Sequence, residues 1–364
     1  MDILLIFTTA FALTALFVPV TIILSKKLGL LDDPKKRPHP AHIQQRIVPR
    51  GGGLPIFISI IVSMLLFIPI TPQLIGIILG LTILLIIGLL DDRYSNFNPY
   101  LRLSLLFLAA AFPVISAISI PFITNPFTLL PNLVVNTTYI SLGGLALPLN
   151  LFGFTHLLTI GDVLAFFWIV TLTQIINWSK GVDGQMPIIT LITALTLGFL
   201  SLRLFLQDDP NQLNVAKLSF IVAGSSLGFL IFNWHPAKIF PGFAGSTILA
   251  FMLAVLAILS GAKLATALLV LAVPSADFIY TFIRRIVTGH SPVWGDRGHL
   301  HHKLLDLGWS HQKISLFYAG FSAIFGLVAL GLDVQSKAFI VLAVMVASLG
   351  LILWLNSFGD LSKR

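Results

Sequence analysis

Pairs of polar side chains interrupt long apolar runs at a few places in this sequence. At 88–95 the stretch GLLDDRYS places Asp91 and Asp92 side by side after a run of apolar residues. One aspartate there would serve equally as an interfacial anchor, but two adjacent carboxylates are costlier to place and are more often functional. Because like charges repel, one of the two pKa values can rise, which suits a base, or the pair can hold a divalent cation.

A second polar interruption is the stretch NWSKGVDGQ at 177–185. Asn177, Lys180 and Asp183 are spaced i, i+3, i+6, so they project from one face if the preceding helix continues. The two glycines of the stretch favour a loop equally, and they would let a ligand approach the backbone closely. The residue types fit a binding site as well as a charged anchor.

Three further stretches carry candidate binding residues. PAKIFPGFAGS at 236–246 resembles a helix start that cradles phosphate, although a connecting turn explains it too. HSPVWGDRGHLHHKLLDLGWS at 290–310 gathers histidines that could ligate a transition metal or, with a guanidinium, bind a diphosphate. DDPKKRPHPAHIQQRIVPRGGG at 32–53 is basic, and an anchor at the membrane surface is its simplest interpretation. The candidates in these stretches are Lys36, Arg50, Lys238, Arg297, His299, His301 and His302.

The elements that must position these residues are membrane-spanning helices. Of the 364 residues, 57% are hydrophobic and 10% are charged, whereas a soluble domain carries about a quarter charged residues. Apolar runs of about 18–20 residues recur, each long enough to cross a bilayer as a helix. We therefore expect an all-α polytopic membrane protein with about eleven transmembrane helices. The expected spans are about 3–24, 52–70, 73–91, 101–120, 161–177, 186–206, 217–234, 245–260, 263–284, 315–332 and 337–356.

The distribution of Lys and Arg orients these spans. Most of the 22 basic side chains and nearly all of the nine histidines fall on the cytoplasmic side if the N-terminus is outside and the C-terminus is cytoplasmic. A basic, histidine-rich inner face suits an anionic ligand. The outer segment 121–160 has no Lys or Arg, and its pieces TTYISLGG and LALPLNL are compatible with a short β-hairpin.

Taken together and in this order, five motifs carry a family resemblance. KRPH…VPRGGG, GLLDDR, NWSKGVDG, PAKIF…GS and SPVWGDRGHLHH resemble the polyprenyl-phosphate N-acetylhexosamine-1-phosphate transferases, the glycosyltransferase 4 family. The resemblance covers nearly the whole chain, which we treat as one integral membrane domain. DRGHLHH is similar to the undecaprenyl-phosphate N-acetylglucosaminyl 1-phosphate transferase-like branch, which starts O-antigen or wall-polymer synthesis.

The resemblance implies a reaction and its partners. A lipid phosphate attacks the β-phosphorus of a UDP-N-acetylhexosamine, commonly UDP-N-acetylglucosamine in this branch. UMP leaves, and a polyprenyl-diphospho-sugar forms as the start of a cell-envelope glycan. The implied partners are the UDP-sugar, polyprenyl phosphate and membrane lipids, without nucleic acid; a homodimer is left open. The implied location is the plasma membrane, with the active site on its cytoplasmic face.

The resemblance also implies residue roles. Asp91 and Asp92 would orient or deprotonate the lipid phosphate, and Asn177 and Asp183 would line the nucleotide–metal pocket. Further substrate contacts would come from the histidines and the basic loops. These residues are His299, His301, His302 and Arg297 around the uridine diphosphate, together with Lys36, Arg50 and Lys238.

Two positions depart from the family pattern. The motif that usually reads Asn-x-x-Asp-Gly-x-Asp-Gly has Lys180 at its first aspartate, and the loop that usually reads Met-Gly-Asp-x-Gly-Ser has Phe243 at the aspartate that ligates magnesium. Phenylalanine cannot ligate a hard cation. The two changes add three units of positive charge, while loss of Mg²⁺ removes two. They therefore compensate for an absent metal.

Two hypotheses follow from these departures. In the first, the enzyme is active and the Lys180 ammonium takes over part of the role of magnesium, with or without a weakened Mg²⁺ site on Asp91, Asp92 and Asp183. In the second, the protein is a degenerate relative that binds lipid phosphate or nucleotide without transfer. The aspartate pair and the histidine cluster, which drift would also erode, favour the first hypothesis.

Asp277, inside the ninth expected span, allows a third interpretation. An acid within the membrane is typical of proton-coupled carriers. Transporters commonly contain repeated halves with discontinuous helices, and we detect no internal repeat in this sequence. A role in helix packing or facing the pocket is favoured for Asp277.

Overall fold

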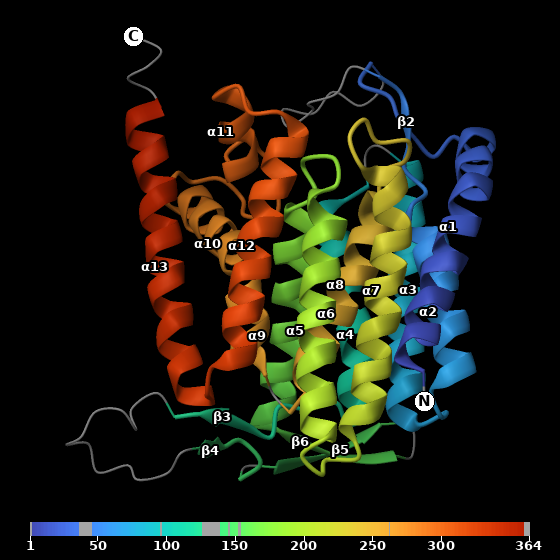
Figure 1. Cartoon of the computed structure of the whole chain (residues 1–364), viewed down its shortest axis with the longest axis vertical. Helices are drawn as coiled ribbons and strands as arrows, with labels where there is room; N and C mark the ends of the chain where they lie inside the picture. Colours follow the sequence, from blue (N-terminus) through green and yellow to red (C-terminus); the bar gives the residue numbers. More distant parts are fainter. Residues whose placement is uncertain are drawn as a thin grey trace.

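The computed structural model describes residues 2–35, 46–94, 97–125, 139–144, 146–151, 154–261 and 263–359. Over these residues the chain is a bundle of helices with most of its short strands at one end (Figure 1). The first helix starts at the end that carries the strands of residues 122–159, which we call the hairpin end, and the last helix ends at the opposite end (Figure 1). We call that opposite end the basic end, because the connecting segments and helix ends there carry most of the Lys and Arg residues.

The helices correspond to the apolar runs of the sequence. Their bounds are α1 (Ile3–Leu28), α2 (Gly53–Phe67), α3 (Pro72–Arg93), α4 (Pro99–Ile115), α5 (Ile160–Trp178), α6 (Gln185–Phe205), α7 (Gln212–Asn233), α8 (Gly242–Leu259), α9 (Leu264–Val270), α10 (Ala272–Val287), α11 (Leu300–Asp306), α12 (His311–Gly331) and α13 (Val334–Gly359). Within the described chain, eight helices are long and apolar enough to cross a membrane, or nine if α9 and α10 form one broken span. The protein is thus a multi-pass membrane protein.

The count of eleven spans stays a prediction. Each expected span overlaps a helix, but α2 and α4 have only 15 and 17 residues, fewer than the about 20 that a transmembrane helix usually has. The ninth expected span is not one straight helix, because α9 and α10 meet at an angle of 85°. Pro274 lies in the first turn of α10 and has no N–H to donate to the preceding turn, which favours a break there.

Helix α8 lies at the centre of the bundle. Its side chains from Gly242 to Ile258 are buried, and it packs against α2, α3, α5 and α7. A helix that is apolar on all sides is expected inside such a core. This packing brings the N-terminus of α8 next to the ends of α3 and α5 at the basic end (Figure 1).

Short antiparallel strand pairs complete the fold. At the hairpin end, β3 (Phe122–Thr124) pairs with β4 (Tyr139–Ser141), and β5 (Ala146–Leu151) pairs with β6 (Phe154–Thr159). Strands form in 121–160 as expected, but the two predicted pieces, which contain β4 and β5, pair with other partners rather than with each other. At the basic end, β1 (Leu31–Asp32) pairs with β2 (Val48–Pro49).

Candidate active site

Lys180 lies in the loop between α5 and α6. Its Nζ donates hydrogen bonds to Asn177 Oδ1 at 2.8 Å, to Gly242 O at 3.1 Å and to Ser246 Oγ at 3.1 Å. The last two partners belong to the first turn of α8. Three oxygen atoms therefore accept the three hydrogens that an ammonium can donate.

The ammonium of Lys180 is deeply buried, although part of the residue reaches the surface. Burial lowers the pKa of Lys180 to about 7, and the Arg50 guanidinium acts in the same direction. The Asp92 and Asp91 carboxylates oppose this shift because they favour the charged form. Near neutral pH the group is poised between ammonium and amine.

The ring of Phe243 has two cations over it. Lys180 Nζ lies 5.4 Å from the ring centroid, and Arg102 Cζ lies 5.0 Å from it. Cations within about 6 Å of an aromatic ring are attracted by its quadrupole. Phe243 is also buried. The two residues that depart from the family pattern therefore contact each other.

Asp92 caps helix α8 from the end of α3. Its carboxylate accepts hydrogen bonds from Phe243 N at 2.9 Å, from Ala244 N at 3.5 Å and from Arg50 Nε at 3.2 Å. The first N–H groups of a helix lack partners within it, so a carboxylate placed there satisfies them and interacts favourably with the helix dipole. Gly242 has a φ of +66°, and a Cβ there would overlap the Asp92 carboxylate. Asp92 is fully buried.

Asp91 is paired separately. Its Oδ1 lies 3.1 Å from Arg102 Nη1, while Arg50 Nη1 lies 3.1 Å from Asp32 Oδ1. The aspartate pair found in the sequence therefore faces two arginines. The prediction that Arg50 lies at the site agrees with this geometry, but Arg102 and Asp32 were not anticipated.

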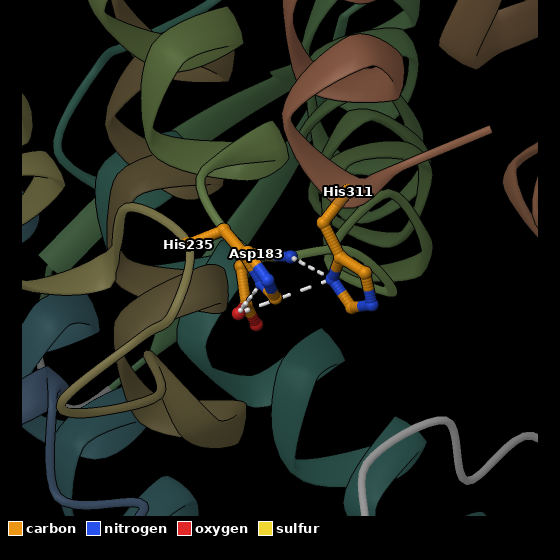
Figure 2. A group of neighbouring side chains, drawn as sticks. All are labelled: Asp183, His235 and His311. Carbon is orange, nitrogen blue, oxygen red and sulfur yellow. Dashed lines mark hydrogen bonds and ion pairs between the residues drawn. The ribbon is translucent and has the colours of Figure 1, made fainter.

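Asp183 lies in a different group of side chains (Figure 2). Its Oδ2 lies 2.8 Å from His235 Nδ1, accepts a hydrogen bond from Ala237 N at 3.0 Å and lies 3.9 Å from His311 Nδ1. The Asp183 N–H donates to the same His311 nitrogen at 3.4 Å. Among the described residues, Asp183, His235 and His311 are the group whose potential metal ligands lie within 4.8 Å of one another.

This geometry decides how the stretch 177–185 folds. The helix ends at Trp178, and the loop keeps Asn177 beside Lys180 while turning Asp183 toward the α7–α8 loop. The described residues do not bring Asp91, Asp92 and Asp183 together as one set of metal ligands. Asn177 and Lys180 therefore lie together, as their spacing predicts, but Asp183 does not lie with them.

A histidine cluster lies against the same loop. His299 Nδ1 lies 2.9 Å from Asp277 Oδ2, and Leu300 N donates to Asp277 Oδ1 at 2.8 Å. The rings of His301 and His302 have centroids 4.4 Å apart, and His301 fills the space that a side chain at position 181 would need. Asp277 therefore pairs with His299 and fixes the orientation of its imidazole.

The histidines of α11 carry little charge at neutral pH. Burial lowers the pKa of His301 well below its usual value, and the neighbouring His302 and His299 act in the same direction. Burial, followed by His299, lowers the pKa of His302 to about 4. Neutral imidazoles can offer hydrogen bonds to a diphosphate, but they do not neutralise its charge.

The remaining predicted residues lie away from this centre. Lys238 is exposed, with Nζ 6.0 Å from the centroid of the Phe232 ring. Arg297 pairs with Asp306 at 2.8 Å in an exposed position. Lys36 lies outside the described residues. His235 and His311 were missed as individual residues, and the only signal for them was the concentration of histidines at the basic end.

Together, the fold and this centre define a multi-pass membrane protein whose polar site lies at one end of the helix bundle. A model of the family described as glycosyl transferase family 4 matches residues 74–261, which include Asp91, Asp92, Lys180 and Phe243. That match covers more than half of the chain. The chain belongs to glycosyl transferase family 4.

Curated relatives extend the similarity beyond the matched segment. The chain is 29% identical over 324 residues to a probable undecaprenyl-phosphate N-acetylglucosaminyl 1-phosphate transferase of Bacillus subtilis, covering 85% of this chain and 80% of that protein. It is 27% identical over 372 residues to the decaprenyl-phosphate N-acetylglucosaminephosphotransferase of Mycobacterium tuberculosis, covering 93% and 85%. A phospho-N-acetylmuramoyl-pentapeptide-transferase of Streptococcus uberis is 37% identical over 111 residues, 30% of this chain and 31% of that protein.

Proposed function

We propose that this protein transfers N-acetylhexosamine 1-phosphate from a UDP-sugar to polyprenyl phosphate at the cytoplasmic face of the plasma membrane. An oxygen of the lipid phosphate bonds to the β-phosphorus, the bond from that phosphorus to the bridging oxygen breaks, and UMP leaves. The names of the relatives that align with most of the chain support this reaction class and favour N-acetylglucosamine as the sugar. The product would begin a lipid-linked cell-envelope glycan.

The observation that carries the proposal is the placement of the Lys180 ammonium. Phosphoryl transfer depends mainly on positioning the groups and on neutralising phosphate charge. Among the described carboxylates, none lies within 4.0 Å of Lys180 Nζ, whereas Arg50 and Arg102 are each paired with aspartates. The ammonium is held by neutral oxygen atoms, so its charge is available to an incoming diphosphate.

The donor set around Asp91 and Asp92 does not fit magnesium. A hard divalent cation takes six or more oxygen ligands, but Asp92 is occupied by two backbone N–H groups and Arg50, and Asp91 is occupied by Arg102. Phe243 offers no oxygen where the family usually supplies a carboxylate. We therefore assign the neutralisation of the diphosphate charge to the Lys180 ammonium rather than to a metal ion.

The other residues of the centre position this charge. Asn177 and Ser246 fix the Lys180 Nζ, and Asp92 fixes the start of α8, whose Gly242 carbonyl is the third partner. Asp91 is the less buried of the two aspartates, and we propose it as the one that meets the lipid phosphate, through its partner Arg102. Asp183 and the α11 histidines would line the nucleotide side.

A transfer assay tests this function. Purified full-length protein is treated with chelator and supplied with UDP-N-acetylglucosamine and undecaprenyl phosphate, and Mg²⁺ is then added back. We expect lipid-diphospho-sugar and UMP to form, with Mg²⁺ changing the rate less than about twofold, because the lysine remains in place. Retained nucleotide binding without product under any metal condition would instead identify a binding protein.

A further inference from the structure

We propose that Asp183, His235 and His311 bind one divalent metal ion of the Zn²⁺ class, at a site distinct from the Lys180 centre. The three side chains come from different parts of the chain and converge at the basic end (Figure 2). Asp183 lies in the α5–α6 loop, His235 in the α7–α8 loop and His311 at the first position of α12. The inference does not depend on the transfer reaction.

The distances suit a small metal ion. Asp183 Oδ2 lies 2.8 Å from His235 Nδ1 and 3.9 Å from His311 Nδ1. Two ligands of a tetrahedral zinc ion with bonds of about 2.0–2.1 Å are roughly 3.3–3.5 Å apart. The measured separations lie on either side of that value, so shifts of about half an ångström in the side chains would reach it.

The hydrogen bonds present the lone pairs that a metal needs. His311 Nδ1 receives the Asp183 N–H, so this nitrogen is unprotonated. His235 Nδ1 donates its hydrogen to the Asp183 carboxylate, and a bound cation would replace that hydrogen. Both imidazole nitrogens face the same carboxylate oxygen in Figure 2. A metal would therefore replace the His235 Nδ1 hydrogen and, at His311 Nδ1, the long hydrogen bond of 3.4 Å from the Asp183 N–H.

The types of ligand choose the metal. Two imidazoles and one carboxylate favour Zn²⁺ and its neighbours among the transition metals, whereas Mg²⁺ prefers a set of oxygen ligands. Arg46 Nη2 lies 3.9 Å from Asp183 Oδ2, but its side chain is 48% exposed and donates to Ala237 O at 2.8 Å. Among the described residues, this guanidinium is the fixed cation nearest to the Asp183 carboxylate, and its exposure lets it move aside.

The site would tie three segments together. The His235 side chain is 38% exposed and that of His311 is 19% exposed, so an ion can reach the ligands from water. Three protein ligands leave one position of a tetrahedral ion open for water or a ligand oxygen. Because Asp183 follows Lys180 by three residues, a bound ion would also fix the loop that carries Lys180.

Metal titration of the full-length protein tests this site. The protein is purified with a histidine-free affinity tag, stripped with chelator and titrated with Zn²⁺ or Co²⁺, without nucleotide or lipid. We expect one Zn²⁺ per chain, binding at least about tenfold weaker in His311→Gln and Asp183→Asn, and no competition from Mg²⁺. His290→Gln, at an exposed histidine of the same end, is the matched control and should bind as wild type does.

A cysteine variant keeps the test decisive if the others fold poorly. The natural chain has no cysteine, so a thiolate-to-Co²⁺ absorption band in His235→Cys can come only from that position. The band should appear with one equivalent of Co²⁺ and vanish in His235→Cys/His311→Gln. The proposal is wrong if wild type binds no Zn²⁺, or if His311→Gln and His290→Gln bind it equally. Transfer activity is scored separately, so its absence leaves this result intact.

Discussion

Lys180 and Asp183 share the α5–α6 loop, but the groups around them handle positive charge in opposite ways. At Lys180 the chain carries its own cation, held by three oxygen atoms and deeply buried. At Asp183 two imidazole nitrogens converge on a carboxylate and remain partly exposed. In our proposals the first arrangement uses its own ammonium in place of a metal, and the second supplies two imidazole nitrogens and a carboxylate oxygen as metal ligands.

The difference shows that a carboxylate alone does not define a metal site. Asp92 is fully buried and accepts hydrogen bonds from two N–H groups, so it acts on the helix end. Asp183 accepts one backbone N–H and faces two imidazoles. What the other lone pairs meet decides whether a carboxylate stabilises structure or holds an ion.

Replacing Lys180 should have the largest effect and should separate the two groups most clearly. Lys180→Met should lower kcat by about 100- to 1,000-fold, the usual cost of losing one preorganised group that stabilises transition-state charge. Single-turnover rates with UDP-N-acetylglucosamine measure this. Lys27→Met, at an exposed lysine near the end of α1, should retain wild-type rates. Equal rates in the two variants would remove Lys180 from the mechanism.

Proton loss from Lys180 gives the next largest effect. Since burial lowers the pKa of Lys180 to about 7, its ammonium is lost as the pH rises. The rate should therefore fall about 50-fold between pH 7 and pH 9 if only the charged form is active. Lys180→Arg, whose guanidinium stays protonated, should flatten the profile even if its absolute rate is lower.

A double substitution that replaces the Lys180 ammonium by carboxylates tests whether the lysine stands in for a metal ion. Because Lys180 and Phe243 contact each other, Lys180→Asp with Phe243→Asp would place two carboxylates beside Asp91 and Asp92. The double variant should lose at least about tenfold in rate on chelation and regain it with Mg²⁺. Either single variant should show a weaker dependence of its rate on Mg²⁺ than the double variant. A double variant that is indifferent to Mg²⁺ would contradict the charge-compensation argument.

A second aspartate–histidine pair provides the smallest expected effect. Asp277→Asn can still accept the Leu300 N–H, but its amide would face His299 Nδ1 and disturb the tautomer of that ring. We expect a loss of about tenfold in kcat, with Zn²⁺ binding at Asp183 unchanged. Loss of Zn²⁺ binding in this variant would show that the two pairs are not independent.

The sequence predicted the helical class, and several residues that it singled out lie together in the Lys180 centre, where their roles stay predictions. The adjacent aspartates and the Asn177–Lys180 spacing were visible because they interrupt apolar runs or follow helical periodicity. Arg102 was not identified, and Ser246 was noted only as a small residue of the 236–246 stretch, because their relation to Lys180 depends on how α4 and α8 pack. The Asp183 group joins residues up to 128 positions apart, and nothing local in the sequence specifies such a contact.

The α9–α10 bend and the strand partners were missed for a related reason. The sequence around Pro274 is apolar on both sides, so hydropathy gives one continuous segment although the missing N–H permits a break. In 121–160, short strands have little alternation to specify their register. Local composition therefore predicted that strands form there without predicting which ones pair.

The attachment of Lys180 to the backbone has a consequence for turnover. A magnesium ion can depart together with a nucleotide product, whereas a side chain stays behind when UMP leaves. An ammonium with a pKa near 7 can weaken its interaction with the UMP phosphate by losing a proton, and it can regain that proton before the next UDP-sugar binds. Under the proposed function, the cycle would run at a rate independent of the supply of free magnesium in the cell.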